Sequence, residues 1–275
     1  MKLNYRKIGT GRPLVFLHGL FGSGDNWSTL AAKFQGCEVW LPDLPNHGDS
    51  PWSEDFSIPH LAEDLLNFLT EHQLESPLLG GHSLGGKVAM EAALQAPRRL
   101  SGLLSLDMSP RAYEPQYSSF VPALRALDLS KLTSRSDAQR ALEQAIPDRP
   151  TLQFLLKSLT PQEGSPPWRW KLNLQALEKH YEEIWKPLAL VSSEGLPRTY
   201  SGPALFLAGG NSDYIRTQDR QLIQELFPQS QLETIPQAGH WLHAEKPQEV
   251  LRALNTWLRQ RDLDDEKRDL NAESR

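Results

Sequence analysis

Short apolar runs alternate with amphipathic stretches along most of the chain. Five continuous apolar runs bounded by turn residues are typical of strands buried on both faces: 14–17, 39–41, 78–80, 103–106 and 204–208. Four stretches between them have the apolar spacing of helices: 27–34, 61–69, 84–96 and 215–227. Strand and helix in alternation predict an α/β fold with a mostly parallel central sheet and helices on both faces.

The alternation stops between residues 109 and 201. This segment is rich in proline and tryptophan and has helical patterns at 121–127, 138–146 and 172–185, but no convincing strand. We predict an α/β core formed by 1–108 and 202–260 and a helical cap formed by 109–201. The cap is expected over the carboxyl edge of the sheet, where open α/β sheets bind ligands. The mostly charged residues 261–275 predict a frayed helical tail in solvent.

Composition is that of an ordinary globular protein with a sizeable core. The 275 residues are 39% hydrophobic and 23% charged, with a formal net charge of −5. This acidic balance argues against a nucleic-acid partner or an anionic membrane surface, since both favour a basic face. The single cysteine, Cys37, excludes an intramolecular disulfide and is expected to be a small, half-buried residue in a reducing compartment.

The first apolar run is too short for a targeting or membrane segment. Residues 1–13 contain charges and no apolar stretch, and the run from 14 to 22 is interrupted by His18. Neither a signal peptide nor a membrane span is therefore predicted. We expect a cytoplasmic protein, either a monomer or a weak homodimer.

The candidate nucleophile is Ser83. It is the centre of the only G-x-S-x-G pattern in the chain, residues 81–85, between a predicted strand and a predicted helix. A sharp turn from strand to helix would hold the serine in a strained conformation, with glycine required two residues before and two after it. The amide of Leu84, at the start of the helix, could donate to a developing oxyanion.

A serine hydroxyl needs a base, and His240 is the best placed of the eight histidines. It lies in a turn between a plausible last strand, LETIP, and the last helix. Because loops at the carboxyl ends of strands share one edge of the sheet, His240 could reach Ser83. His243, at the start of the last helix, is expected to be structural.

The loop after the first apolar run supplies the second oxyanion donor. Gly19 permits a tight bend, and the amide of Leu20 could then point at the same oxygen as that of Leu84. His18 is expected to brace this loop rather than act as an acid or base. His47, which also follows a strand, is expected to brace a turn.

In combination, these motifs resemble the α/β-hydrolase superfamily over residues 14–258. The shared order is a His-Gly loop, D-L-x-x-H-G-x-S at 43–50, the serine motif and a late A-G-H at 238–240. HGLFGS, NHGDS, GHSLGGK, LDMSP, GGNSDY and AGHWLHAEKP are most similar to a branch of small serine esterases, the bacterial acyl-ester and acyl-CoA hydrolases and their mitochondrial abhydrolase relatives. Asn46 stands where the superfamily often has glycine. The resemblance implies a serine esterase with a helical cap, without a metal or cofactor.

The acid that orients His240 has two candidates. Asp213 follows the strand after the predicted cap and matches the general G-x-x-D pattern of the superfamily. Asp107, in LLSLDMSP, follows the strand after the serine-bearing helix and matches the esterase branch. Both would lie at a carboxyl end of a strand, and we favour Asp107.

Three functions are compatible with these residues. The leading hypothesis is hydrolysis of small carboxylic esters or thioesters through an acyl-serine intermediate. HGLFGSGDNW and SLGGK also resemble the menaquinone-pathway lyase, whose substrate needs cations such as Lys87, Arg111, Arg169 and Arg198. The third hypothesis is a ligand-binding signalling protein with slow turnover, since fold and triad do not determine a physiological role.

The predicted cap should set the preference for acyl chains. Six apolar residues are candidates for its pocket or lid: Phe120, Leu124, Leu155, Trp168, Trp170 and Trp241. Apolar residues at such spacing more often belong to an ordinary core, so none is assigned to the substrate.

Overall fold

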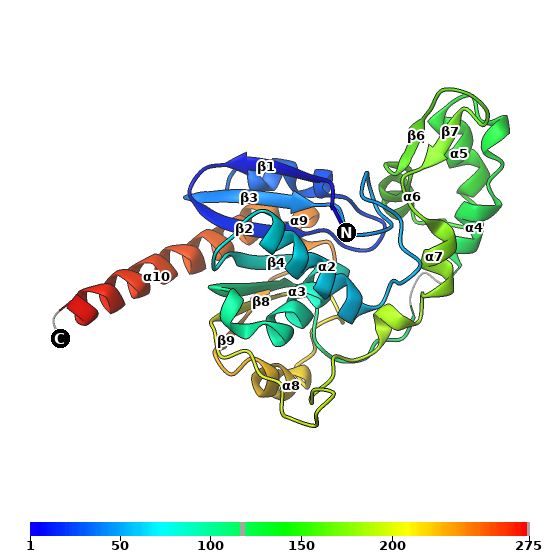
Figure 1. Ribbon diagram of the computed structural model, residues 1–275. Coiled ribbons are helices and arrows are strands. Elements are labelled where there is room, and N and C mark those ends of the chain that lie inside the picture. Colours follow the sequence, from blue (N-terminus) through cyan, green and yellow to red (C-terminus); the bar gives the residue numbers. More distant parts are fainter. Residues whose placement is uncertain (116–118, 274–275) are drawn as a thin grey trace.

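A seven-stranded sheet forms the centre of the protein. The computed structural model describes residues 1–115 and 119–273, and side chains as far as residue 261. The strand order is β1-β3-β2-β4-β5-β8-β9, and Figure 1 shows the sheet with β1 and β9 at its two edges. Their bounds are Tyr5–Gly9 (β1), Arg12–Leu17 (β2), Cys37–Pro42 (β3), Leu78–His82 (β4), Gly102–Leu106 (β5), Ala204–Gly209 (β8) and Ser230–Ile235 (β9).

The sheet is parallel except at one edge. β1 pairs antiparallel with β3, and all other neighbouring strands pair in parallel. All five apolar runs lie in strands, and the predicted mostly parallel α/β fold is confirmed. β1 was not predicted because its residues, YRKIG, are largely exposed and contain no apolar run. Cys37 is buried rather than half-buried, because β3 lies between β1 and β2.

Side chains alternate between the two faces of the sheet, which divides the core in two. In β2, Val15 and Leu17 pack on the face covered by helices α2 (Ile58–Glu71) and α3 (Leu84–Gln95). Leu14 and Phe16 pack on the opposite face. That face is covered by η1 (Gly24–Trp27), α1 (Ser28–Ala31), α9 (Leu242–Glu245) and α10 (Pro247–Glu273). The remaining core elements are η2 (Pro97–Arg99) and α8 (Asp219–Leu226).

The segment between β5 and β8 forms a separate group of short elements beyond one end of the sheet (Figure 1). It comprises α4 (Phe120–Ala126), η3 (Leu129–Lys131), α5 (Arg135–Leu142), α6 (Arg149–Leu156), β6 (Leu159–Pro161), β7 (Trp168–Trp170), α7 (Leu174–Lys179) and η4 (Glu183–Trp185). Its buried side chains are continuous with the core face that α2 and α3 cover. The segment can therefore form one wall of a site at that end of the sheet.

The expectation that this segment contains no strand is wrong. β6 and β7 pair antiparallel as a small hairpin with three residue pairs. Strands of three residues are too short to give a readable alternation of apolar and polar positions. The predicted helix at 172–185 is also interrupted, since α7 ends at Lys179 and η4 follows as a separate turn.

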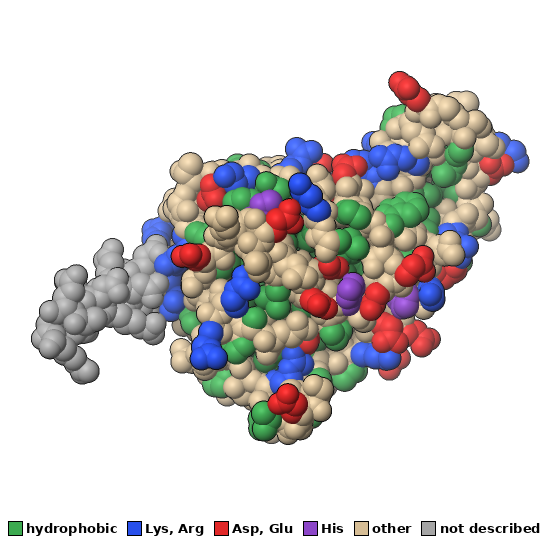
Figure 2. Space-filling view, viewed as in Figure 1, with side chains coloured by type: hydrophobic (Ala, Val, Ile, Leu, Met, Phe, Trp, Pro, Cys, Tyr) green, Lys and Arg blue, Asp and Glu red, His purple; other side chains and the backbone are tan. Residues whose placement is uncertain are grey.

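The carboxyl-terminal residues continue a regular helix. α10 extends to Glu273 and, in Figure 1, its red end projects away from the sheet. No helix in the described ranges is both long enough and apolar enough to cross a membrane. On the face drawn in Figure 2, acidic and basic side chains are interspersed, without a large basic patch.

Candidate active site

Ser83 occupies a sharp turn between β4 and α3. Its backbone has φ 55° and ψ −122°, a conformation that is costly for a residue with a side chain. A Cβ on Gly81 would lie 2.3 Å from the backbone carbon of Gly85, and one on Gly85 would lie 2.5 Å from the His18 carbonyl oxygen. Glycine is therefore required on both sides of the serine by close backbone approach.

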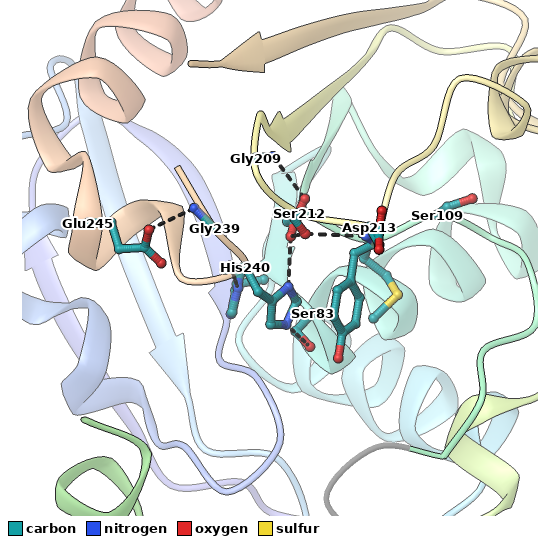
Figure 3. Close-up of polar contacts among 12 residues, drawn as sticks. Ser83, Ser109, Gly209, Ser212, Asp213, Gly239, His240 and Glu245 are labelled. Atoms are coloured by element: carbon teal, nitrogen blue, oxygen red, sulfur yellow. Dashed lines mark hydrogen bonds and ion pairs between the residues drawn. The ribbon is translucent and has the colours of Figure 1, made fainter. Parts of the chain in front are cut away.

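Ser83, His240 and Asp107 form one hydrogen-bonded series (Figure 3). Nε2 of His240 lies 3.0 Å from Oγ of Ser83. Nδ1 of the same ring lies 2.8 Å from Oδ2 of Asp107. With Nδ1 protonated and donating to the carboxylate, Nε2 is left to accept the serine proton, which is the arrangement a general base requires.

Asp107 is completely buried and is held by the loop that follows β8. Its Oδ1 accepts a hydrogen bond from the amide of Gly209 at 2.9 Å. Its Oδ2 accepts one from the hydroxyl of Ser212 at 2.5 Å, in addition to the contact with His240. A buried carboxylate that accepts these bonds remains a fixed acceptor for the imidazole, since each bond stabilises its charged form.

Asp213, the alternative acid, does not contact His240 in the described part of the chain. Its side chain is exposed. Its backbone carbonyl accepts hydrogen bonds from Arg111 and Arg216. The structure thus brings Asp107 to the histidine and leaves the Asp213 carboxylate outside the hydrogen-bonded series.

The two predicted oxyanion donors, Leu20 and Leu84, belong to two different segments near Ser83. Leu84 begins α3, and Leu20 lies in the loop after β2 and lines the same pocket as Ser83. Within the described residues neither amide has a hydrogen-bond acceptor. The neighbouring amide of Phe21, by contrast, donates to Nε2 of His47 at 3.1 Å. Leu20 and Leu84 thus have amides available for an oxygen that is not part of the protein.

His18 and His47 brace the loop that carries Leu20. Nε2 of His18 accepts from the amide of Leu44 at 2.9 Å, and its Nδ1 donates to the carbonyl of Gly19. Burial lowers the pKa of His18, and burial together with the nearby His18 lowers the pKa of His47 to about 3. Both rings are therefore neutral near pH 7, as accepting from backbone amides requires.

His82, inside the serine motif, was not predicted to have a role. Its Nε2 donates to the backbone carbonyl of His240 at 2.8 Å. Burial, with His243 and His240 nearby, lowers the pKa of His82 well below the ordinary value. A second contact holds the same loop, since Glu245 accepts from the amide of Gly239 at 2.7 Å. His82 occupies a variable position of the pattern, so the motif alone could not indicate this contact.

Ser83 and His240 open onto a pocket of about 500 Å³ between the core and the segment from α4 to η4. This volume is within the ordinary range for small-molecule sites. Its Phe, Tyr and Trp lining residues are Phe21, Trp27, Phe120, Phe154, Trp185, Tyr214 and Trp241. Of the six apolar candidates, Phe120, Leu155 and Trp241 line this pocket, whereas Leu124, Trp168 and Trp170 are not among its lining residues.

None of the four cations considered for an anionic substrate lines this pocket. Arg111 is paired with Asp219, Arg198 with Glu91, and Arg169 lies near Asp49. Lys87 is buried one turn after Ser83, and its Nζ donates to the carbonyl of Ile184 at 3.0 Å. Burial, with a smaller contribution from Arg111, lowers the pKa of Lys87 to about 7.

Replacing Lys87 with methionine should change how the free energy of unfolding depends on pH. The folded-state pKa of about 7 lies below the ordinary 10.5, so the unfolded chain binds more protons between these values. The contribution of Lys87 to the free energy of unfolding therefore rises with pH across this interval and levels off outside it. Because methionine does not titrate, wild-type stability relative to the variant should rise by on the order of 3 kcal/mol from about pH 6 to about pH 10.

Urea unfolding of both proteins at several pH values measures this difference. Lys131→Met is the matched control, because the Lys131 side chain is 83% exposed. Its stability difference from the wild type should stay nearly constant with pH. A Lys87→Met difference that is equally constant would contradict the burial effect.

Known proteins resemble this chain over most of its length. A family model described as "alpha/beta hydrolase fold" matches residues 12–247. The mouse (Mus musculus) protein named sn-1-specific diacylglycerol lipase ABHD11 is 37% identical over 254 residues, covering 89% of this chain and 80% of that protein. Esterase YbfF of Escherichia coli K12 is 35% identical over 265 residues, covering 94% and 99%. A solved structure titled "Marine microorganism esterase" matches with TM-score 0.86 and 37% identity, covering 92% of this chain and 98% of that one.

Proposed function

This chain belongs to the alpha/beta-hydrolase fold family, in its esterase branch, and on that premise we propose that it is a serine hydrolase of small carboxylic esters or thioesters. The observation that carries the proposal is the Ser83–His240–Asp107 series, of which Ser83 and His240 line the pocket. The names of the relatives support ester cleavage, and the geometry supports the acyl-serine route.

In the first half of the reaction Ser83 would attack the acyl carbonyl. His240 Nε2, 3.0 Å from the serine oxygen, takes the hydroxyl proton as the new C–O bond forms. The resulting oxyanion receives hydrogen bonds from the amides of Leu20 and Leu84. His240 then gives its proton to the leaving alcohol or thiol, and the acyl group remains on Ser83.

In the second half a water molecule would repeat the sequence. His240 takes a proton from water as the water oxygen attacks the acyl-serine carbonyl, and returns it to Ser83 as the acid is released. Asp107 keeps the proton of the neutral imidazole on Nδ1 and stabilises the imidazolium at both stages. Neither half requires a group from outside this site other than substrate and water.

The pocket favours an apolar acyl chain. Its lining is rich in aromatic side chains contributed by both the core and the segment from α4 to η4. Each methylene buried there contributes about 0.8 kcal/mol, or roughly a 4-fold increase in kcat/KM at most. For p-nitrophenyl esters we therefore expect kcat/KM to rise from acetate through butyrate to octanoate.

Two variants test whether this pocket sets the preference. Phe154→Ala, which removes a lining ring, should flatten the dependence on chain length. Trp52→Ala removes a ring that is 60% exposed and not among the pocket-lining residues, and should leave the dependence unchanged. If kcat/KM falls from acetate onward in the wild type, the pocket does not hold the acyl chain.

The same assay separates the alternative functions. The four cations considered for the lyase, Lys87, Arg111, Arg169 and Arg198, are outside the pocket lining, whereas Lys33 and Lys157 line it. A slow-turnover signalling protein would release about one equivalent of p-nitrophenol and stop. Sustained turnover through many cycles is the result that the hydrolase proposal predicts.

A further inference from the structure

The His240 imidazole is stacked on the ring of Tyr214. The ring centroids are 3.6 Å apart and the ring planes differ by 14°. Tyr214 is itself only 5% exposed, and it lies within the loop between β8 and α8. A ring buried this closely against the imidazole limits how far His240 can tilt out of the plane that contains both of its hydrogen bonds.

The backbone of Tyr214 is also tied to the buried acid. Its amide donates to Oγ of Ser212 at 3.2 Å, and the Ser212 hydroxyl donates to Asp107. Asp107 accepts from His240, and His240 stacks on Tyr214. These four residues therefore form a closed circuit of contacts in which each side chain limits the movement of the next.

A second set of contacts fixes Tyr214 from outside the circuit. The hydroxyl of Tyr113 donates to the Tyr214 carbonyl at 2.7 Å and accepts from the amide of Ser109 at 2.7 Å. Burial raises the pKa of Tyr113, so its hydroxyl stays protonated and can donate. The guanidinium of Arg111 lies 3.9 Å above the Tyr113 ring and also pairs with Asp219.

Stacking has a consequence for the reaction as well as for geometry. The imidazole gains a positive charge when it takes the serine proton, and the face of an aromatic ring attracts a cation. The ring of Tyr214 therefore interacts more strongly with the imidazolium than with the neutral base. Interactions that strengthen toward the transition state raise kcat rather than lowering KM.

We propose that Tyr214 is a positioning residue for His240, and that its aromatic ring, held by Ser212 and Tyr113, keeps the imidazole aligned between Ser83 and Asp107. The loop from Gly209 to Tyr214, which carries Asp213 at its surface, holds the acid and the base without supplying the acid. This inference rests on the proposed serine mechanism.

The test compares Tyr214→Leu, which keeps an apolar side chain without a ring, with Tyr214→Phe, which keeps the ring. Misalignment of a reacting group by about 1 Å can cost roughly 100-fold, so Tyr214→Leu should lower kcat by roughly 10- to 100-fold with little change in KM. Tyr214→Phe should recover most of that loss. Tyr200→Leu removes another buried ring, one that packs on Phe227, and should lower the melting temperature without lowering kcat of the folded protein.

Ser212→Ala tests whether the circuit is closed. If Ser212 and Tyr214 act on the same alignment, the double variant Ser212→Ala/Tyr214→Leu should lose less kcat than the product of the two single losses. If the loss of kcat in the double variant equals the product of the two single losses, the two residues act independently, which would contradict the closed circuit. A near-normal kcat in Tyr214→Leu, or an equal loss in Tyr214→Phe, would overturn the positioning role of the ring.

A second readout separates this inference from the proposed function. A p-nitrophenyl alkylphosphonate phosphonylates an activated serine: the Ser83 oxygen bonds to phosphorus, p-nitrophenolate leaves, and His240 receives the hydroxyl proton. The rate of p-nitrophenolate release should follow the order wild type, Tyr214→Phe, Tyr214→Leu. If esters are not turned over but this order holds, only the proposed function fails. If ester turnover depends on Ser83 but the order does not hold, only the inference fails.

Discussion

Replacing Ser83 with alanine is expected to reduce ester turnover by roughly 10⁴- to 10⁶-fold, the largest effect of any single substitution. The variant loses the only oxygen within hydrogen-bond distance of His240 Nε2 among the described residues, so no acyl-enzyme can form. The fold should be retained, because removing one hydroxyl leaves the turn and its glycines unchanged. Release of p-nitrophenol from the butyrate ester, at equal concentrations of folded protein, measures this loss.

A matched serine-to-alanine control is available nearby. Ser109 is buried at the carboxyl end of β5, and its hydroxyl has no partner in the described part of the chain. Ser109→Ala should therefore retain turnover. Substantial activity in Ser83→Ala would mean that a different group attacks the ester.

Replacing Asp107 with asparagine should have the second largest effect, a loss of roughly 10⁴-fold in kcat. Asparagine keeps the shape and can still accept from Gly209 or Ser212 through its oxygen. It cannot stabilise an imidazolium by charge, and its amide favours the imidazole tautomer that carries the proton on Nε2. That tautomer cannot accept the proton of Ser83.

Asp213→Asn is the matching substitution that decides between the two candidate acids. The Asp213 carboxylate is exposed and outside the hydrogen-bonded series, so kcat should change by less than about 3-fold. The pH dependence of kcat/KM should be preserved in this variant. A near-normal kcat in Asp107→Asn together with a large loss of kcat in Asp213→Asn would mean that Asp213, in the loop after β8, is the acid.

The alternation of apolar runs and amphipathic stretches predicted the buried strands of the sheet and the main helices beside them. Buried parallel strands are apolar on both faces, which makes runs such as those in β2 and β8 visible without any partner. β1 and the β6–β7 hairpin were missed for the opposite reason. An exposed edge strand and three-residue strands carry no periodic signal, and only pairing with distant residues makes them strands.

The serine motif and the late histidine were recognisable because each depends on a local pattern. The choice between Asp107 and Asp213 was not local, since both follow a strand that ends at the same edge of the sheet. What separates them is the path of each loop. Asp107 turns inward at φ 49°, whereas the loop after β8 turns Ser212 and Tyr214 inward and leaves Asp213 at the surface.

Residues that contact His240 without exchanging a proton with it were the hardest to predict. His82 and Tyr214 lie on two elements far apart in the sequence, and both meet His240. His82 fills a variable position of G-x-S-x-G and Tyr214 follows the G-x-x-D pattern, so neither pattern indicates a contact with His240. Their role follows only from the packing around the imidazole.

The most direct test of the acyl-serine account is mass spectrometry of the protein quenched during turnover of p-nitrophenyl butyrate. The acyl-serine mechanism predicts a butyryl group on the peptide that contains Ser83. This group should be absent from Ser83→Ala and should disappear from the wild type as the substrate is exhausted. Turnover without acyl transfer to Ser83, or with the acyl group on another residue, would contradict it.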